Sequence, residues 1–247
     1  MNVMKLLLVI LISALKTTTA HAKSDTWIFT TLEWPPFMCS RCPENGAAAK
    51  ALRETLRKSG IRVEFSFQSW TKAVKNGSLK ENVGFFPAWH EEVREGFVSS
   101  SALFFSPVGF VEPRSKPLIW NHLSDLKGKV IGISQDYGYP KEFNQLVAAG
   151  VIKVEVVESD DTNLRKVALG RVDGALLDIN NARYFLSMSL KNLGGRVSVN
   201  NKVVENKSLH AAFNSYSHDK VAILEGALRQ TNFQKIVDDY LKKYTRL

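Results

Sequence analysis

Cysteine is scarce in this sequence, whose 247 residues include only Cys39 and Cys42. A structural zinc site needs four ligands, and the sequence has no second cysteine pair. The histidines after residue 22 form no His-x-x-x-His pair either; they are His90, His122, His210 and His218. We therefore expect neither a bound metal nor another cofactor.

Long apolar runs and catalytic signatures are also scarce. The run from Leu6 to Leu15 covers about half of the roughly 20 residues that a membrane helix needs, and no later run approaches that length. The sequence contains no G-x-G-x-x-G motif and no phosphate-binding loop. "GISQD" at 132–136 lacks the final glycine of a nucleophile elbow, and "HEEVR" at 90–94 ends in Arg where a zincin helix has His. These absences favour a protein that is not an enzyme, although they leave catalysis open.

The first 22 residues have the pattern of a cleaved secretory signal. Lys5 precedes the apolar run, a polar segment follows it, and Ala20-His21-Ala22 supplies the small residues of a cleavage site. An uncleaved N-terminal anchor is the alternative interpretation. We expect export to the periplasm, and removal of the signal takes away two lysines and no acid, so that the formal net charge falls from +9 to +7.

The charges that remain are scattered along the chain. The segments "RETLRK" at 53–58 and "LKKYTR" at 241–246 are typical of solvated helix faces. No basic stripe alternates with aromatic residues, as a nucleic-acid-binding surface would require. We therefore expect no nucleic-acid partner.

Strand-like and helix-like segments alternate in two series. The first series consists of strands at 26–32, 61–67 and 82–88 and helices at 46–60 and 70–77. The second series begins after a break at Pro113 and Pro117, with strands at 129–134, 152–158 and 172–178 and helices at 139–150, 162–170 and 179–190. Such βαβ series predict mostly parallel sheets flanked by helices. Two series in tandem therefore predict two α/β lobes, each with its own sheet, and a cleft between them. The last segments, from 209 onward, are expected to return to the first lobe.

Six motifs follow one another along the chain. They are the aromatic-Pro-Pro-Phe turn at 34–37, Trp70 opening a helix that ends at Gly77, "EEVREGFVSSSALFFSPVGFV", "LKGKVIGI", "LGRVDGALLD", and "LHAAFN" with the later "LRQTNFQKIVDDY". In this order they resemble the family 3 extracellular solute-binding proteins, the periplasmic components of polar amino-acid transporters. The resemblance covers essentially all of the chain after residue 22. It implies the two-lobed type II periplasmic-binding fold, with a two-crossing hinge near 108–112 and 201–206.

The resemblance also implies lobe boundaries and partners. Residues 23–110 and 206–247 would form lobe 1, and residues 111–205 would form lobe 2. A small polar or aromatic, amino-acid-like ligand would be clamped between the lobes and delivered by a monomeric protein to an inner-membrane ABC permease. Two rival functions stay open. One is a dehydratase-like periplasmic enzyme of the same fold that uses Glu33 and Asp178 as an acid and base pair; the other is a free-standing sensor that signals to a membrane partner.

Three residues of the first lobe are candidates for ligand binding through this resemblance. Trp34 and Trp70 match aromatic positions beside the ligand, where flat rings provide contact area and can face a cation. The alternative is that both are core residues. Arg94 matches the position that binds the α-carboxylate of an amino acid bidentately. The alternative is a surface arginine paired with an acidic neighbour.

The sequence departs from the family just before Arg94. Amino-acid binders usually carry a Ser/Thr-rich run there, whereas this chain has Pro87-Ala88-Trp89-His90. Side chains with hydroxyl hydrogen-bond donors are thus replaced by larger side chains that carry no hydroxyl group. We expect Trp89 to line the site and to favour a smaller, flatter or aromatic ligand.

The second lobe supplies four further candidates. "SQDYGYP" at 134–140 lies where the family opens a helix towards the ligand, and backbone N–H groups at such a terminus bind anionic groups. Tyr137, Gly138 and Tyr139 are therefore candidates, with an ordinary strand-to-helix turn as the alternative. Asp178 matches a position where the family often places an acid against a ligand ammonium group. Its alternative role is the N-cap of the next helix.

The C-x-x-C in "EWPPFMCSRCPENG" allows three interpretations. A structural disulfide, a redox pair and half of a metal site all use this spacing. Pro43 and Gly46 separate the cysteines from the following helix, whereas a thioredoxin-like motif opens its helix with the first cysteine. A local disulfide is the default in an oxidising compartment, and so small a ring contributes only roughly 2 kcal/mol. We expect it to stiffen the loop that carries Trp34.

Overall fold

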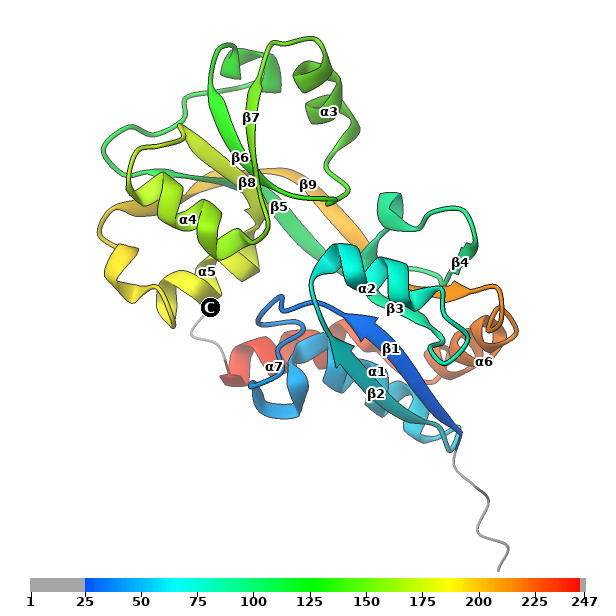
Figure 1. Ribbon diagram of the computed structural model, residues 1–247. Coiled ribbons are helices and arrows are strands. Elements are labelled where there is room, and N and C mark those ends of the chain that lie inside the picture. Colours follow the sequence, from blue (N-terminus) through cyan, green and yellow to red (C-terminus); the bar gives the residue numbers. More distant parts are fainter. Residues whose placement is uncertain (1–24, 245–247) are drawn as a thin grey trace, which may run out of the picture.

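The computed structural model describes residues 25–244, which form two lobes joined by two long strands (Figure 1). The predicted signal peptide, residues 1–22, lies outside the described residues. The first lobe contains β1 (Thr26–Thr31), β2 (Arg62–Phe67), β3 (Gly84–Trp89) and β4 (Phe97–Ser99) with α1 (Ala47–Arg57), α2 (Trp70–Gly77), α6 (Lys220–Leu228) and α7 (Phe233–Tyr244). The second lobe contains β6 (Val130–Ser134), β7 (Lys153–Val157) and β8 (Gly174–Asp178) with α3 (Lys141–Ala148), α4 (Asp160–Ala168) and α5 (Ile179–Ser187). The two joining strands are β5 (Phe104–Pro113) and β9 (Val197–Asn214).

One hydrogen-bonded path runs through both lobes in the order β2-β1-β3-β9-β5-β8-β6-β7, with β4 paired to β9. Within the lobes β1 is parallel to β2 and β3, and β6 is parallel to β7 and β8, as the βαβ series predicts. β5 and β9 run antiparallel to each other and to their neighbours. The two predicted sheets are therefore joined into one path, because both long strands pass from one lobe to the other (Figure 1).

The predicted hinge crossings at 108–112 and 201–206 lie within β5 and β9. The pairing of these two strands shifts register on both sides of Gly109, and such bulges bend a strand and increase its twist. The lobe boundaries at 110 and 206 also fall inside the two strands and stay predictions, as does the hinge motion itself.

The core of the first lobe is largely aromatic. Trp27 and Phe29 are fully buried on one face of β1, and Phe213 of β9 meets their rings edge-on at 5.9 and 5.5 Å between centroids. Gly46 is the N-cap of helix α1, and its φ of +104° suits glycine. A Cβ there would lie 2.4 Å from the carbonyl oxygen of Phe37, so only glycine allows the helix to start this close to the preceding loop.

The core of the second lobe is mostly aliphatic and lies between its strands and helices α4 and α5. Its fully buried members include Val111, Leu164, Val167, Ala175 and Leu177. The sequence predicts irregular backbone over 111–120, but β5 continues to Pro113, which pairs with Val197 at the end of the strand. A strand end tolerates proline because the missing N–H is not needed there. Among residues 25–244, no helix is long and apolar enough to cross a membrane.

The end of the chain lies against the first lobe. Helix α7 packs on α1, and the hydroxyl of Tyr240 donates a hydrogen bond of 2.8 Å to the carbonyl of Pro43. The loop between β1 and α1 is thus held from two sides, by the end of β1 and by α7. This loop carries Trp34 and both cysteines.

Candidate functional site

The two lobes meet through hydrogen bonds between the α2 and β3 ends of the first lobe and the loop after β6 in the second. The backbone N–H of Gly138 donates to Glu92 Oε1 at 3.0 Å. The hydroxyl of Thr71 donates to Asp136 Oδ2 at 2.6 Å, and the indole N–H of Trp70 donates to the Asp136 carbonyl at 3.3 Å. The lobes are therefore in direct contact in this structure.

A small inner cavity of about 20 Å³ lies between the lobes. That volume holds about one water molecule. Seven of its eight lining residues come from the first lobe, and Tyr137 comes from the second. The lining consists of Leu32, Trp34, Trp70, Pro87, Trp89, Glu92, Tyr137 and Leu209.

An outer cavity of about 490 Å³ lies next to the inner one and shares Leu32, Trp70 and Tyr137 with it. Its volume is in the range of pockets that hold small molecules. Both lobes contribute to its walls. The other lining residues are Glu33, Pro35, Gln68, Ser69, Glu158, Ser159, Asp160, Asp161, Asn181 and Phe185.

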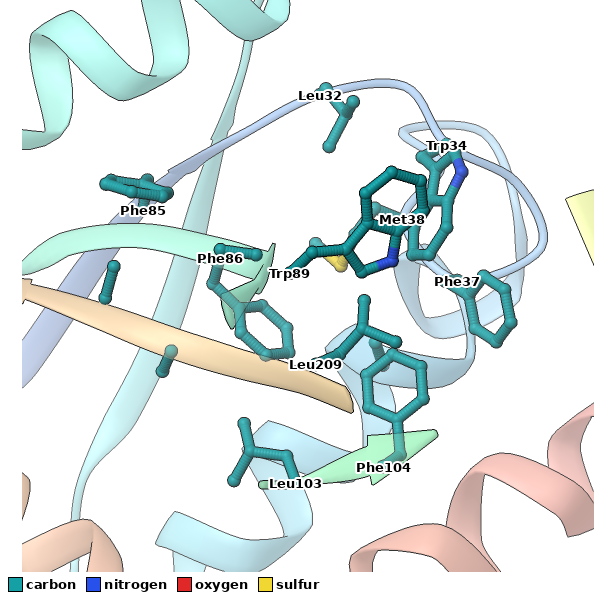
Figure 2. Close-up of a cluster of buried hydrophobic side chains, with 14 of the residues drawn as sticks. Leu32, Trp34, Phe37, Met38, Phe85, Phe86, Trp89, Leu103, Phe104 and Leu209 are labelled. Atoms are coloured by element: carbon teal, nitrogen blue, oxygen red, sulfur yellow. The ribbon is translucent and has the colours of Figure 1, made fainter. Parts of the chain in front are cut away.

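The three sequence-predicted tryptophans all line the inner cavity, and Trp70 lines the outer one as well. Figure 2 shows Trp89 in the middle of a buried aromatic cluster, with Trp34 beside it and Leu209 close by. The Trp34 and Trp89 rings meet edge-on at 6.3 Å, and Trp89 meets Tyr137 at 5.4 Å. All three tryptophans are also buried. Trp34 and Trp70 therefore line a cavity and are also buried core residues, two roles that the sequence left as alternatives.

Glu92 is a site residue that the sequence analysis missed. Strand β3 ends at Trp89, and the 3₁₀ turn His90–Glu92 brings the Glu92 carboxylate back to accept the Trp89 N–H at 2.9 Å. This return of a carboxylate to the backbone three residues earlier is a capping arrangement. Trp89 lacks the hydroxyl of the usual capping signature, so the sequence carries no distinctive signal for Glu92.

Burial changes the acidity of Glu92. Desolvation raises its pKa from 4.5 to about 8. The N–H groups of Trp89 and Gly138 and the ammonium of Lys207 act in the opposite direction, whereas Glu91 adds to the rise. In this closed arrangement, Glu92 is therefore largely protonated at neutral pH.

The structure does not bring Arg94 to either cavity. Its side chain is 56% exposed, and its Nη2 lies 4.0 Å from Asp136 Oδ1. The turn after β3 explains this position, because it directs Glu92 inward and leaves Arg94, two residues later, at the surface. The observed arrangement matches the surface alternative, with a partner in the other lobe, and binding of a ligand carboxylate by Arg94 stays a prediction.

The "SQDYGYP" segment contributes one wall residue and one contact between the lobes. Tyr137 lines both cavities. The N–H of Gly138 already donates to the Glu92 carboxyl group. In this structure, the acidic group bound at the turn is therefore a side chain of the protein and not a ligand. The hydroxyl oxygen of Tyr139 accepts the Ser134 N–H at 2.7 Å, and its ring is buried and lines neither cavity, so a ligand contact by Tyr139 stays a prediction.

Substituting Gly138 with alanine is expected to separate the lobes. A Cβ at Gly138 would lie 3.1 Å from Glu91 Cβ and Glu92 Cγ, closer than most real Cβ contacts. Overpacking of this kind costs about 1–3 kcal/mol, which lobe separation relieves. Small-angle X-ray scattering should therefore give a larger radius of gyration for Gly138→Ala than for wild type. Gly195→Ala is the control, because a Cβ there meets nothing within 4 Å. Identical radii for all three proteins would contradict the prediction.

Asp178 is the N-cap of α5. Its Oδ1 accepts the Asn181 N–H at 2.9 Å, which confirms the capping alternative. Asp178 is fully buried, and desolvation raises its pKa to about 7. It is not among the lining residues of either cavity, whereas Glu33 lines the outer cavity. In the described residues, the two acids of the enzymatic alternative therefore do not share a cavity.

Cys39 and Cys42 form a disulfide, as the sequence predicts. Just before this ring, the same loop contains a pair of backbone hydrogen bonds between Trp34 and Met38, of 2.8 and 3.0 Å. Cys42 Sγ lies 3.5 Å from the hydroxyl of Tyr184 on α5 of the second lobe. The disulfide thus lies at the contact between the lobes, and its effect on the rigidity of the loop stays a prediction.

Comparisons with solved structures identify the fold. An ancestral arginine-binding protein bound to arginine is 17% identical, covers 89% of this chain and 98% of its own, and has a TM-score of 0.72. The periplasmic VFT2 domain of Bordetella pertussis BvgS is 16% identical, with 89% and 94% covered and a TM-score of 0.73. A histidine kinase sensor domain with similarity to periplasmic binding proteins is 15% identical, with 90% and 96% covered and a TM-score of 0.73.

The sequence comparisons add no relative. No family model matches the chain, and no curated protein matches it. At identities of 15–17%, the structural similarity establishes the fold and leaves the function to be argued from the site. The chain therefore has the two-lobed type II fold of periplasmic amino-acid-binding proteins and of periplasmic sensor domains.

Proposed function

We propose that the chain binds a small polar or aromatic, amino-acid-like solute between its two lobes. The observation that carries this proposal is the outer cavity of about 490 Å³, whose walls come from both lobes. A ligand there contacts both lobes at once, so its contacts exist in full only when the lobes are together. Such differential contacts are what allow a ligand to favour the closed arrangement.

The solute is handed to a partner in the inner membrane, which we propose to be an ABC permease. The protein acts as a periplasmic monomer after cleavage of its signal peptide and is not an enzyme. A sensor role is the second candidate, because the BvgS VFT2 domain and the histidine kinase sensor domain have TM-scores as high as that of the arginine-binding protein. Loss of solute uptake in a strain lacking the protein supports the permease, whereas unchanged uptake with altered gene expression supports the sensor.

Ligand binding is expected to stabilise the protein against heat. A ligand at about 100 times its dissociation constant adds roughly 2.7 kcal/mol, which raises the Tm of a chain of this size by about 5–10 °C. Thermal unfolding of residues 23–247 is measured with amino acids, aromatic acids, amines and sugars. A compound that raises the Tm and is recovered chemically unchanged supports a binding protein. A compound that is converted supports the enzyme, and no shift with any compound contradicts the proposal.

A further inference from the structure

The lining of the two cavities is acidic. Five carboxyl groups contribute to it, and none of the lining residues, all of which belong to the described part of the chain, is Lys, Arg or His. Glu33, Glu158, Asp160 and Asp161 line the outer cavity, whereas Glu92 lines the inner one and is largely protonated at neutral pH. The whole chain, by contrast, has 33 Lys and Arg against 24 Asp and Glu. The charge of the outer cavity is thus opposite to that of the protein.

Another hollow shows that acidic lining is not a general property of this surface. It has a volume of about 940 Å³, lies between β5, α5 and β9, and includes Arg114, Arg183 and Lys202 in its lining. One of the four acids of the outer cavity already has a cationic partner, because Arg165 lies 3.6 Å from Asp161. Among the described residues, Glu33, Glu158 and Asp160 form no ion pair within 4.0 Å, so three carboxyl groups of the outer cavity are without a cationic partner.

Three hydrogen-bond donors in the lining of the outer cavity are engaged within the protein, whereas one buried acceptor is free. The side-chain N–H₂ of Asn181 donates to the Pro35 carbonyl, and the Ser159 hydroxyl donates to Asp161. The indole N–H of Trp70 is bound by Asp136. Asn181 Oδ1, however, is buried without a hydrogen-bond partner, and the residue is fully buried at the wall of the cavity. A buried acceptor of this kind requires a donor, which a ligand can supply.

Two aromatic side chains face the same space. Trp70 and Tyr137 come from different lobes and line both cavities. An aromatic ring attracts a cation through its negative face, and the attraction strengthens where water is excluded. Aromatic walls, carboxylates and a free amide oxygen all suit a positively charged hydrogen-bond donor.

We propose that the solute is an organic cation, an amine or a guanidinium compound, whose charged group lies in the outer cavity between Trp70 and Tyr137 and pairs with the acids of its lining. This inference rests on the proposed binding function and specifies its ligand class. Asp160 and Asp161 also lie in the first turn of α4, where acids stabilise a helix. Glu33 and Glu158 lie outside that helix, so helix stabilisation does not account for them.

The ligand class is tested with matched probes on residues 23–247. Arginine and putrescine carry cationic groups, citrulline is the neutral isostere of arginine, and glutamate carries the opposite charge. We expect a Tm rise with a cationic probe and an affinity at least tenfold weaker for its neutral counterpart. Tight binding of only neutral or anionic probes would overturn the inference and leave the proposed function standing. No binding by any of the probes, nor by the broader panel, would overturn both.

The assigned acids are tested with a charge-matched pair of double variants. Glu33→Gln/Glu158→Gln removes two exposed acids from the outer cavity, both of them outside helix α4. Glu95→Gln/Glu142→Gln removes two exposed acids away from both cavities and changes the net charge equally. We expect the first variant to bind the cationic probe at least tenfold more weakly and the second to bind as wild type. Equal affinities for the two variants would show that the acids do not hold the ligand. An unchanged Tm without ligand verifies that the folds are intact.

Discussion

Replacing Trp89 with alanine is expected to produce the largest loss of stability of any change at the site, about 3–5 kcal/mol. The Trp89 side chain is 3% exposed. Its ring packs edge-on against Trp34, Tyr137 and Tyr139, and the ammonium of the buried Lys207 lies 5.3 Å from its centroid. Truncation therefore leaves a void where the two lobes meet. Equilibrium unfolding in urea measures the change.

The same variant is expected to lose ligand binding, because Trp89 supports Tyr137 at the wall of both cavities. Trp120→Ala is the matched control. Trp120 is also buried and packs edge-on against Phe110 at 5.4 Å, but it lines neither cavity. It should therefore lose a comparable amount of stability and keep its affinity. If ligand binding weakened in both variants, or in neither, Trp89 would have no specific role in the proposed site.

Stability is expected to fall as the pH rises from about 4.5 to about 8, because burial raises the pKa of Glu92 in the closed structure from 4.5 to about 8. In this window the folded chain holds a proton that the unfolded chain has released, so the stabilisation is complete below 4.5 and is lost as the pH passes the folded pKa. One such group contributes about 1.4 kcal/mol for each pH unit. Lys207 and Glu91 are the charged neighbours that face it.

Glu92→Gln isolates this contribution. Burial also raises the pKa of Asp160 to about 6 and of Asp178 to about 7, so the interval from pH 7 to pH 8 belongs mainly to Glu92. Glutamine cannot accept hydrogen bonds from both Trp89 and Gly138, and the variant should be less stable at pH 5. Its free energy of unfolding should nevertheless change less between pH 7 and 8 than that of wild type. If the free energy of unfolding changed by the same amount between pH 7 and 8 in the variant and in wild type, Glu92 would not titrate as proposed.

The architecture could be predicted from the sequence because it rests on local signals. Alternating strand and helix patterns indicate both α/β lobes, and the helix predicted at 70–77 has the bounds that the structure gives α2. The joining of the two sheets was missed because it depends on β5 and β9, which are far apart in the sequence and pair through long-range contacts. β5 also continues to Pro113, beyond the predicted break, since a proline at a strand end costs no ladder bond.

The site could be predicted only in part. Trp34, Trp70 and Trp89 line the cavity because aromatic residues at strand ends and loop turns are placed by local structure. Glu92 was missed because a three-residue turn decides that it faces inward and leaves Arg94 at the surface, whereas ligand binding by Arg94 stays a prediction. The acidic outer cavity was missed for a similar reason. Its residues come from separate segments of the chain, 32–35, 68–70, 137, 158–161, 181 and 185, which only the folded lobes bring together.

The most direct test of the account is a crystal structure of the protein grown with the cation that stabilises it most. The account predicts the ligand in the outer cavity, with its charged group against Trp70, Tyr137 and the carboxylates of the second lobe. A ligand held instead by Arg94, or seated in the hollow beside Arg114 and Arg183, would contradict it.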